Sequence, residues 1–70
     1  MKRFSVGQKW IMADPVLGTF FGEVIEISDD GQSGTVVITD DQANILDTFT
    51  GNAADFQASG EWQLVEPLSQ

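Results

Sequence analysis

The chain has 70 residues, which predicts one small domain, and its eleven acidic and three basic residues give a formal net charge of −8. It contains no cysteine and no histidine, which excludes disulfides, thiolate metal sites and the commonest general base. The acidity argues against binding to nucleic acid or anionic lipid, because most of the surface repels phosphates.

The apolar segments of the first half are short and separated by turn signals, a pattern typical of a small barrel or sandwich. Residues 9–13 (KWIMA) predict a first strand, which ends at Asp14-Pro15, a pair that favours a turn. Residues 15–21 predict a loop or irregular hairpin arm, and residues 22–28 predict a second strand.

The second strand contains a conflict in its apolar pattern. Val24 and Ile27 lie an odd number of residues apart, so strict alternation cannot bury both side chains. We therefore expect a bulge or a sharp bend within this strand.

The second half continues with turns and β-prone segments. Asp29-Asp30-Gly31 and residues 40–44 predict turns, and Asn52 is placed to cap a single helical turn over 53–56. The remaining strands are predicted at 35–39, 45–50 and 61–66.

The order of these elements is a strand, an arm, a three-strand meander, a helical turn and a final strand. That order is typical of SH3-like barrels, which include Tudor and KOW modules. The expected fold is therefore all-β, a five-stranded SH3-like barrel over residues 1–66 with one short helical turn before the last strand. Residues 67–70 are expected to form a frayed tail.

The opening of the chain carries a more distinctive pattern: FSVGQKWI at 4–11, LG at 17–18 and GEV at 22–24. Over residues 1–27 it resembles the opening of the N-terminal Tudor-like module of the bacterial RNA-polymerase-associated SNF-type ATPase. The resemblance implies an SH3-like fold, a bacterial cytoplasmic setting and a link to the transcription machinery.

The residues that carry chemistry favour a binding role. The serines have no visible base to activate them, and a barrel of this size has no room for a cleft that buries a sugar between two carboxylates. Asp29-Asp30 and Asp40-Asp41 lack the alternating spacing of a calcium loop, and aspartate is favoured in turns for backbone reasons. We expect no enzymatic activity, no metal site and no cofactor.

The aromatic residues allow a second interpretation. Trp10, Phe20, Phe21, Phe49 and Trp62 are candidates for a cage around a methylated cation. A barrel this small needs most of its large side chains for the core, however. Phe20 and Phe21 are neighbours on an extended segment, so they face opposite ways, and one of them is expected to be exposed.

Together these patterns predict a non-enzymatic protein-interaction module that binds a basic protein surface through the 15–21 arm and the 40–44 turn. The candidate partner-binding residues are Trp10, Phe20, Phe21, Asp40 and Asp41. No apolar run is long enough to span a bilayer. We expect a cytoplasmic monomer that contacts neither membrane nor nucleic acid.

The alternative hypothesis is an acidic nucleic-acid mimic that inhibits a nucleic-acid-binding enzyme, with carboxylates spaced like phosphates. The residues that suggest it are Glu23, Glu26, Asp29, Asp30, Asp40, Asp41 and Asp47. An acidic surface also keeps a small protein soluble without any such role. A structural domain with a dedicated partner is a third class that the sequence leaves open.

The net charge of −8 leads to a prediction about salt. Repulsion among the carboxylates destabilises the compact state, and salt screens it, so the melting temperature should be higher at about 0.5 M sodium chloride than at low salt. Thermal unfolding followed by circular dichroism measures this. A melting temperature that is unchanged or lowered by salt would mean that local ion pairs outweigh the net repulsion.

Overall fold

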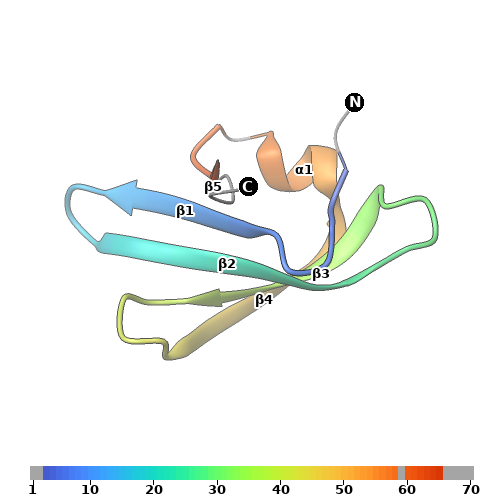
Figure 1. Ribbon diagram of the computed structural model, residues 1–70. Helices are drawn as coiled ribbons and strands as arrows, with labels where there is room; N and C mark the ends of the chain where they lie inside the picture. Colours follow the sequence, from blue (N-terminus) through green and yellow to red (C-terminus); the bar gives the residue numbers. More distant parts are fainter. Residues whose placement is uncertain (1–2, 59, 66–70) are drawn as a thin grey trace.

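Five antiparallel strands form one sheet, and a short helix lies over one of its faces (Figure 1). The computed structural model describes residues 3–58 and 60–65. In chain order the elements are β1 (Lys9–Asp14), β2 (Gly18–Ile27), β3 (Ser33–Thr39), β4 (Ile45–Asn52), α1 (Ala53–Gln57) and β5 (Gln63–Val65). The order across the sheet is β4-β3-β2-β1-β5, so the β-branched strand β3 is paired on both sides.

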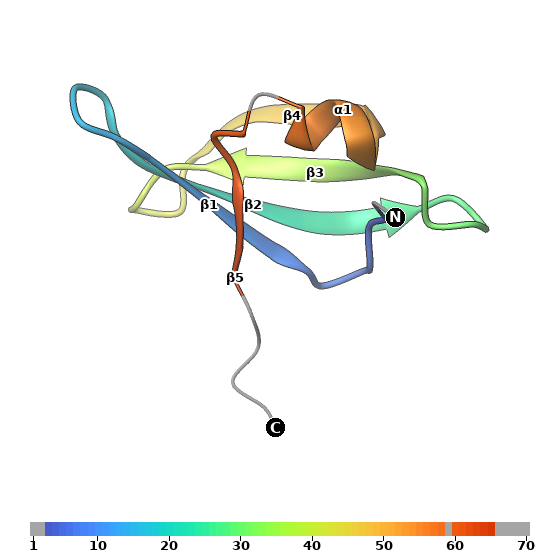
Figure 2. The same ribbon diagram turned by 90° about the horizontal axis from the view of Figure 1, so that it is seen from above.

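The sheet has two edges, β4 and β5, and no pairing joins them within the described residues. Figure 2 shows α1 beside β3 and β4. The pairing of β5 with β1 places β5 at the opposite edge of the sheet. The predicted five strands and the helical turn before the last strand are confirmed. The predicted closure into a barrel is not shown, because the sheet is open.

The segment at 15–21 differs from the prediction of a loop or irregular arm. Strand β2 begins at Gly18 and covers ten residues, and its pairing with β1 is regular from Gly18 to Glu23. Phe20 pairs with Met12 and Phe21 pairs with Ile11 across the β1–β2 ladder. Because two phenylalanines are adjacent, the sequence shows no alternation of apolar and polar residues at this point of β2. The pairing with β1 is what makes this segment a strand.

The expected irregularity in β2 is a β-bulge at Ile25. Val24 pairs with Val36 and Glu26 pairs with Thr35, which leaves Ile25 without a partner on β3. The bulge brings Val24 and Ile27 to the same face, where Val24 is fully buried but Ile27 remains 40% exposed. Ile27 lies opposite a glycine, Gly34, which has no side chain to cover it.

The helical turn is confirmed and extends to Gln57, but the predicted capping hydrogen bond from the Asn52 side chain is absent. Asn52 occupies the N-cap position and its side chain makes no capping hydrogen bond. Instead the Ser33 hydroxyl donates to Asn52 Oδ1 at 2.7 Å, and the Ala53 N–H donates to the Gln32 carbonyl at 2.7 Å. The start of α1 is therefore anchored to the β2–β3 connection, which is distant in sequence.

The last strand is shorter than the predicted 61–66, since β5 covers Gln63–Val65 within the described residues. Trp62 precedes β5 and stacks on the Phe56 ring, with the ring centroids 5.1 Å apart and the planes 25° apart. This stacking holds the chain on the helix side of the sheet before β5 begins. Glu66 and the predicted tail at 67–70 lie outside the described residues.

The core is centred on the helix residue Phe56, which is 5% exposed. Its ring also contacts Phe4, Trp10 and Phe49, at centroid distances of 5.8, 5.5 and 5.2 Å. The small core is completed by Val24, Val36 and Ala53. Within residues 3–58 and 60–65, no helix is long and apolar enough to cross a membrane.

The four ring contacts of Phe56 predict that its removal has a large effect on stability. Phe56→Ala should lower the free energy of unfolding by about 3–5 kcal/mol, and Phe56→Leu should lower it less. Urea unfolding followed by tryptophan fluorescence measures both variants. The matched control is Phe21→Ala on the opposite face of the sheet, which should cost about 1 kcal/mol or less. Equal losses at the two positions would contradict the central role of Phe56.

Candidate functional site

The structure separates the five predicted partner-binding residues. Phe20 and Phe21 point to opposite faces of β2, as predicted, and Phe21 is the more exposed at 38%. Trp10 is 4% exposed, belongs to the core, and donates from Nε1 to Gln8 Oε1 at 3.2 Å. Its indole is therefore a structural group, although part of Trp10 lines a groove.

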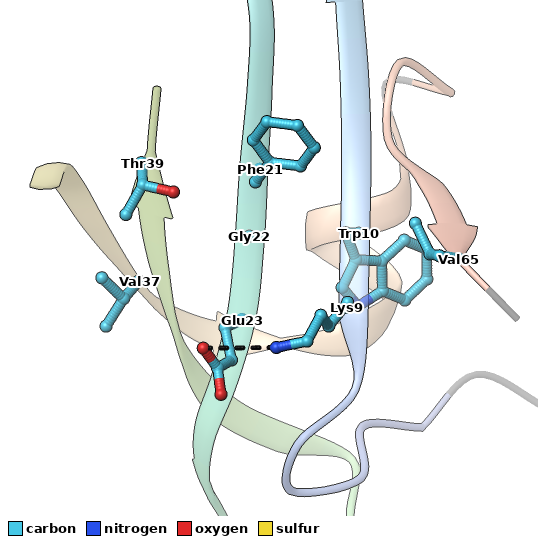
Figure 3. A pocket seen from close by; sticks show the side chains of 8 residues that line it. All are labelled: Lys9, Trp10, Phe21, Gly22, Glu23, Val37, Thr39 and Val65. Atoms are coloured by element: carbon cyan, nitrogen blue, oxygen red, sulfur yellow. Dashed lines mark ion pairs between the residues drawn. The ribbon is translucent and has the colours of Figure 1, made fainter. Parts of the chain in front are cut away.

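That groove lies on the outer face of the sheet, which is the face opposite α1 (Figure 3). It has a volume of about 350 Å³. We call it the outer-face groove, and the residues that line it are Lys9, Trp10, Phe21, Gly22, Glu23, Val37, Thr39 and Val65.

The strand register explains why these residues meet. Glu23 lies opposite Lys9 on one side and Val37 on the other. Val65 of β5 also lies opposite Lys9, which extends this row to the edge of the sheet. Phe21 belongs to the next row of outward-facing side chains, so the groove runs between two rows that cross the strands.

One ion pair spans the groove. Lys9 Nζ lies 3.5 Å from Glu23 Oε1, and the two side chains are 62% and 55% exposed (Figure 3). An exposed pair of this kind contributes about 0–1 kcal/mol to stability. The other groove side chains that the register places on this face are apolar or hydroxylic, namely Phe21, Val37, Thr39 and Val65.

The β3–β4 turn is organised by one of its two predicted aspartates. Asp40 Oδ1 accepts the backbone N–H groups of Gln42 and Asn44 at 2.8 and 2.9 Å, and Asp40 Oδ2 accepts the Asn44 side-chain amide at 3.0 Å. These hydrogen bonds, with the Asn44 side chain first, lower the pKa of Asp40. Asp41 is exposed beside it.

The β1–β2 turn is built in the same way. Asp14 Oδ1 accepts the backbone N–H groups of Val16 and Leu17 at 2.7 and 2.8 Å. The hydrogen bond from Leu17 and then that from Val16 lower the pKa of the Asp14 carboxyl. The turn thereby holds two adjacent aliphatic side chains in solvent, Val16 at 87% exposure and Leu17 at 72%.

These two turns lie at the same end of the sheet (Figure 1). The β3–β4 turn is followed by two further exposed aliphatic residues, Ile45 at 72% and Leu46 at 52% exposure. We call this region the two-turn end, defined by residues 14–18 and 40–46. Sequence reasoning placed its two turns in the partner site but did not single out the aliphatic residues. The VL pair between Pro15 and Gly18 was the available signal.

The remaining carboxylates are spread over the molecule. Asp30, at the opposite end, accepts the Gln32 N–H and the Ser28 hydroxyl, which lower its pKa in that order. Asp55 lies on α1, and Glu26 lies on β2. This distribution does not favour the nucleic-acid mimic over the interaction module. Within the described part of the chain, no three acidic side chains gather closely enough to hold a metal ion.

Comparison of the chain with models of known protein families, with curated proteins and with solved structures found no match. The two surface features from which a function can be inferred are the two-turn end and the outer-face groove.

The hydrogen bonds of Asp40 lead to a prediction about acid stability. Its folded-state pKa lies below the ordinary value of 3.8, so ionised Asp40 stabilises the fold above that pH. This stabilisation is lost as the pH falls through the lower, folded-state pKa. Asp40→Asn should therefore be less stable than the wild type near pH 7 and should lose less stability on acidification to about pH 2.

Urea unfolding at a series of pH values measures this difference. Asp41→Asn is the matched control, because it removes the same charge one residue away and leaves the Asp40 hydrogen bonds intact. Asp41→Asn should still lose the stability that protonation of Asp40 removes when the pH is lowered. Parallel pH profiles for the wild type and Asp40→Asn would show that the turn does not depend on the ionised carboxylate.

Proposed function

We propose that the chain is a non-enzymatic interaction module with an SH3-like architecture of the Tudor or KOW type, which binds a basic surface of a partner protein. The single observation that carries this proposal is the two-turn end. Four exposed aliphatic side chains lie there among carboxylates, two on the β1–β2 turn and two at the start of β4, and internal hydrogen bonds hold both turns in place.

The rigidity of the turns supports a binding role. An exposed aliphatic side chain on a flexible loop loses conformational freedom when it binds, which weakens the interaction. Val16 and Leu17 avoid much of this loss, because Asp14 and the ring of Pro15 restrict the backbone that carries them. The turn thus presents two anchors close to their bound geometry.

The charge at this end supports a basic partner. Asp14, Asp40 and Asp41 lie on the two turns. The described basic residues lie elsewhere, since Lys9 is at the far end of β1 and the Arg3 side chain lies near Gly31 at the opposite end of the sheet. A basic surface with an apolar patch is complementary to this arrangement, with charge raising the association rate and the aliphatic anchors supplying affinity.

The order of elements supports the SH3-like part of the proposal. The meander β1–β4, followed by a one-turn helix and a strand paired to β1, follows the SH3-like order. The resemblance of the opening residues to a module associated with RNA polymerase favours a partner in the transcription machinery.

The test is a titration of the isotope-labelled full chain with a synthetic peptide of alternating arginine, lysine and leucine, followed by NMR. Amide shifts should concentrate at Val16, Leu17 and Ile45, and the affinity should fall as salt is added. The double variant Val16→Ser/Leu17→Ser should bind at least about fivefold more weakly, since it loses anchors worth about 1 kcal/mol or more.

The matched control is Ile25→Ser, which removes an exposed aliphatic side chain, 48% accessible, away from the two turns. It should bind the basic peptide like the wild type. A glutamate-leucine peptide of equal length should not bind. Equal affinity for the basic and acidic peptides, or shifts that avoid the two turns, would overturn the proposal.

A further inference from the structure

The outer-face groove places an aromatic ring and a carboxylate side by side. Phe21 and Glu23 are two residues apart on β2, so they share a face, and their Cα atoms are about 7 Å apart. Both side chains line the groove, as do the apolar side chains of Val37 and Val65 (Figure 3). A ligand between them meets a flat apolar surface on one side and a negative charge on the other.

From this geometry we infer that the outer-face groove is a subsite for one arginine side chain of the basic partner. The inference rests on the proposed function, and it specifies the residue that the partner contributes. A guanidinium group is planar, stacks on an aromatic face and forms paired hydrogen bonds to a carboxylate. Phe21 offers the face and Glu23 offers the carboxylate.

The rest of the groove suits the stem of the same side chain. Arginine carries its charge at the end of a chain of methylene groups, which pack on apolar surface while the head reaches a polar partner. Val37 and Val65 supply apolar surface on either side of the Lys9–Glu23 pair. The volume of about 350 Å³ is large enough for a long side chain.

In the free protein the ammonium group of Lys9 occupies this subsite by pairing with Glu23. This ammonium group lies 3.5 Å from Glu23 Oε1 and neutralises the one carboxylate among the described residues that line the groove. The pair is exposed and therefore weak, and the flexible lysine side chain can swing into solvent. An entering guanidinium group replaces the ammonium group as the partner of Glu23, so Lys9 competes with the ligand and limits its affinity.

The experiment titrates the isotope-labelled full chain with N-acetylarginine amide as the probe and with N-acetylcitrulline amide as its uncharged analogue. The arginine probe should shift the amides of Phe21, Gly22 and Glu23, and the citrulline probe should bind at least about fivefold more weakly. Lys9→Met should tighten arginine binding by at least about twofold, because the competing cation is gone. Glu23→Gln should weaken it about fivefold.

Two matched controls separate local from overall charge effects. Arg3→Met removes a cation outside the groove, and Glu26→Gln removes a carboxylate from the same strand outside the groove. Each should leave arginine binding within about twofold of the wild type. Equal binding of the arginine and citrulline probes would overturn the subsite, and unchanged affinity in Lys9→Met would overturn the role of Lys9.

The two proposals fail in different ways. If the basic peptide binds the two-turn end and the arginine probe leaves the groove amides unshifted, the subsite alone is wrong. If the arginine probe binds the groove and the basic peptide does not bind the two-turn end, the proposed function is wrong. The arginine site would then exist, but its assignment to a basic partner protein would also be wrong.

Discussion

The fold depends on the contact of one ring with four others. Phe56, on a helix of only five residues, packs against Phe4, Trp10, Phe49 and Trp62. Phe49 belongs to the edge strand β4, and Trp62 lies just before the other edge strand, β5. Since these edges are not joined by hydrogen bonds in the described residues, the aromatic cluster connects the two sides of an open sheet. A small domain gains much of its core from this cluster, because large rings bury more area per residue than any aliphatic side chain.

The position of this cluster also determines what the other face can do. The five rings of this cluster all lie on the side of the sheet that carries α1. A side chain at Gly22 would come within 2.9 Å of Val36 Cγ1, so the packed face has no spare room there. The outer face carries a single phenylalanine, Phe21, which pairs with Ile11 and lies beside the Lys9–Glu23 pair. The groove is therefore a consequence of concentrating the core on one side.

The aspartates of the turns combine a structural role with a surface role. Asp14 and Asp40 accept backbone hydrogen bonds that hold the two turns of one sheet end. The same carboxylates place negative charge beside the exposed aliphatic side chains of that end. A turn aspartate thus needs no binding role to be explained, and the proposed binding role depends on the exposed aliphatic side chains that accompany the two turns.

The sequence by itself determined the local structure of this protein. Alternating apolar residues, turn residues such as Asp29-Asp30-Gly31, and the conflict between Val24 and Ile27 were enough to predict five strands, a helical turn and a bulge. These features depend on neighbours within a few residues, which the sequence shows directly. The separation of Phe20 and Phe21 onto opposite faces follows from the same local geometry.

Tertiary structure decided the rest, because those features depend on which distant segments meet. The start of β2 at Gly18 follows from pairing with β1, and the Asn52 side chain bonds Ser33 rather than its own helix. Trp10 was a candidate binding residue by position and became a core residue through contact with Phe56. The groove and the two-turn end exist only because the strand register aligns side chains that are far apart in sequence. Turns and the apolar pattern fix the register within each hairpin, but a row such as Val37, Glu23, Lys9 and Val65 forms only when all the strands are assembled.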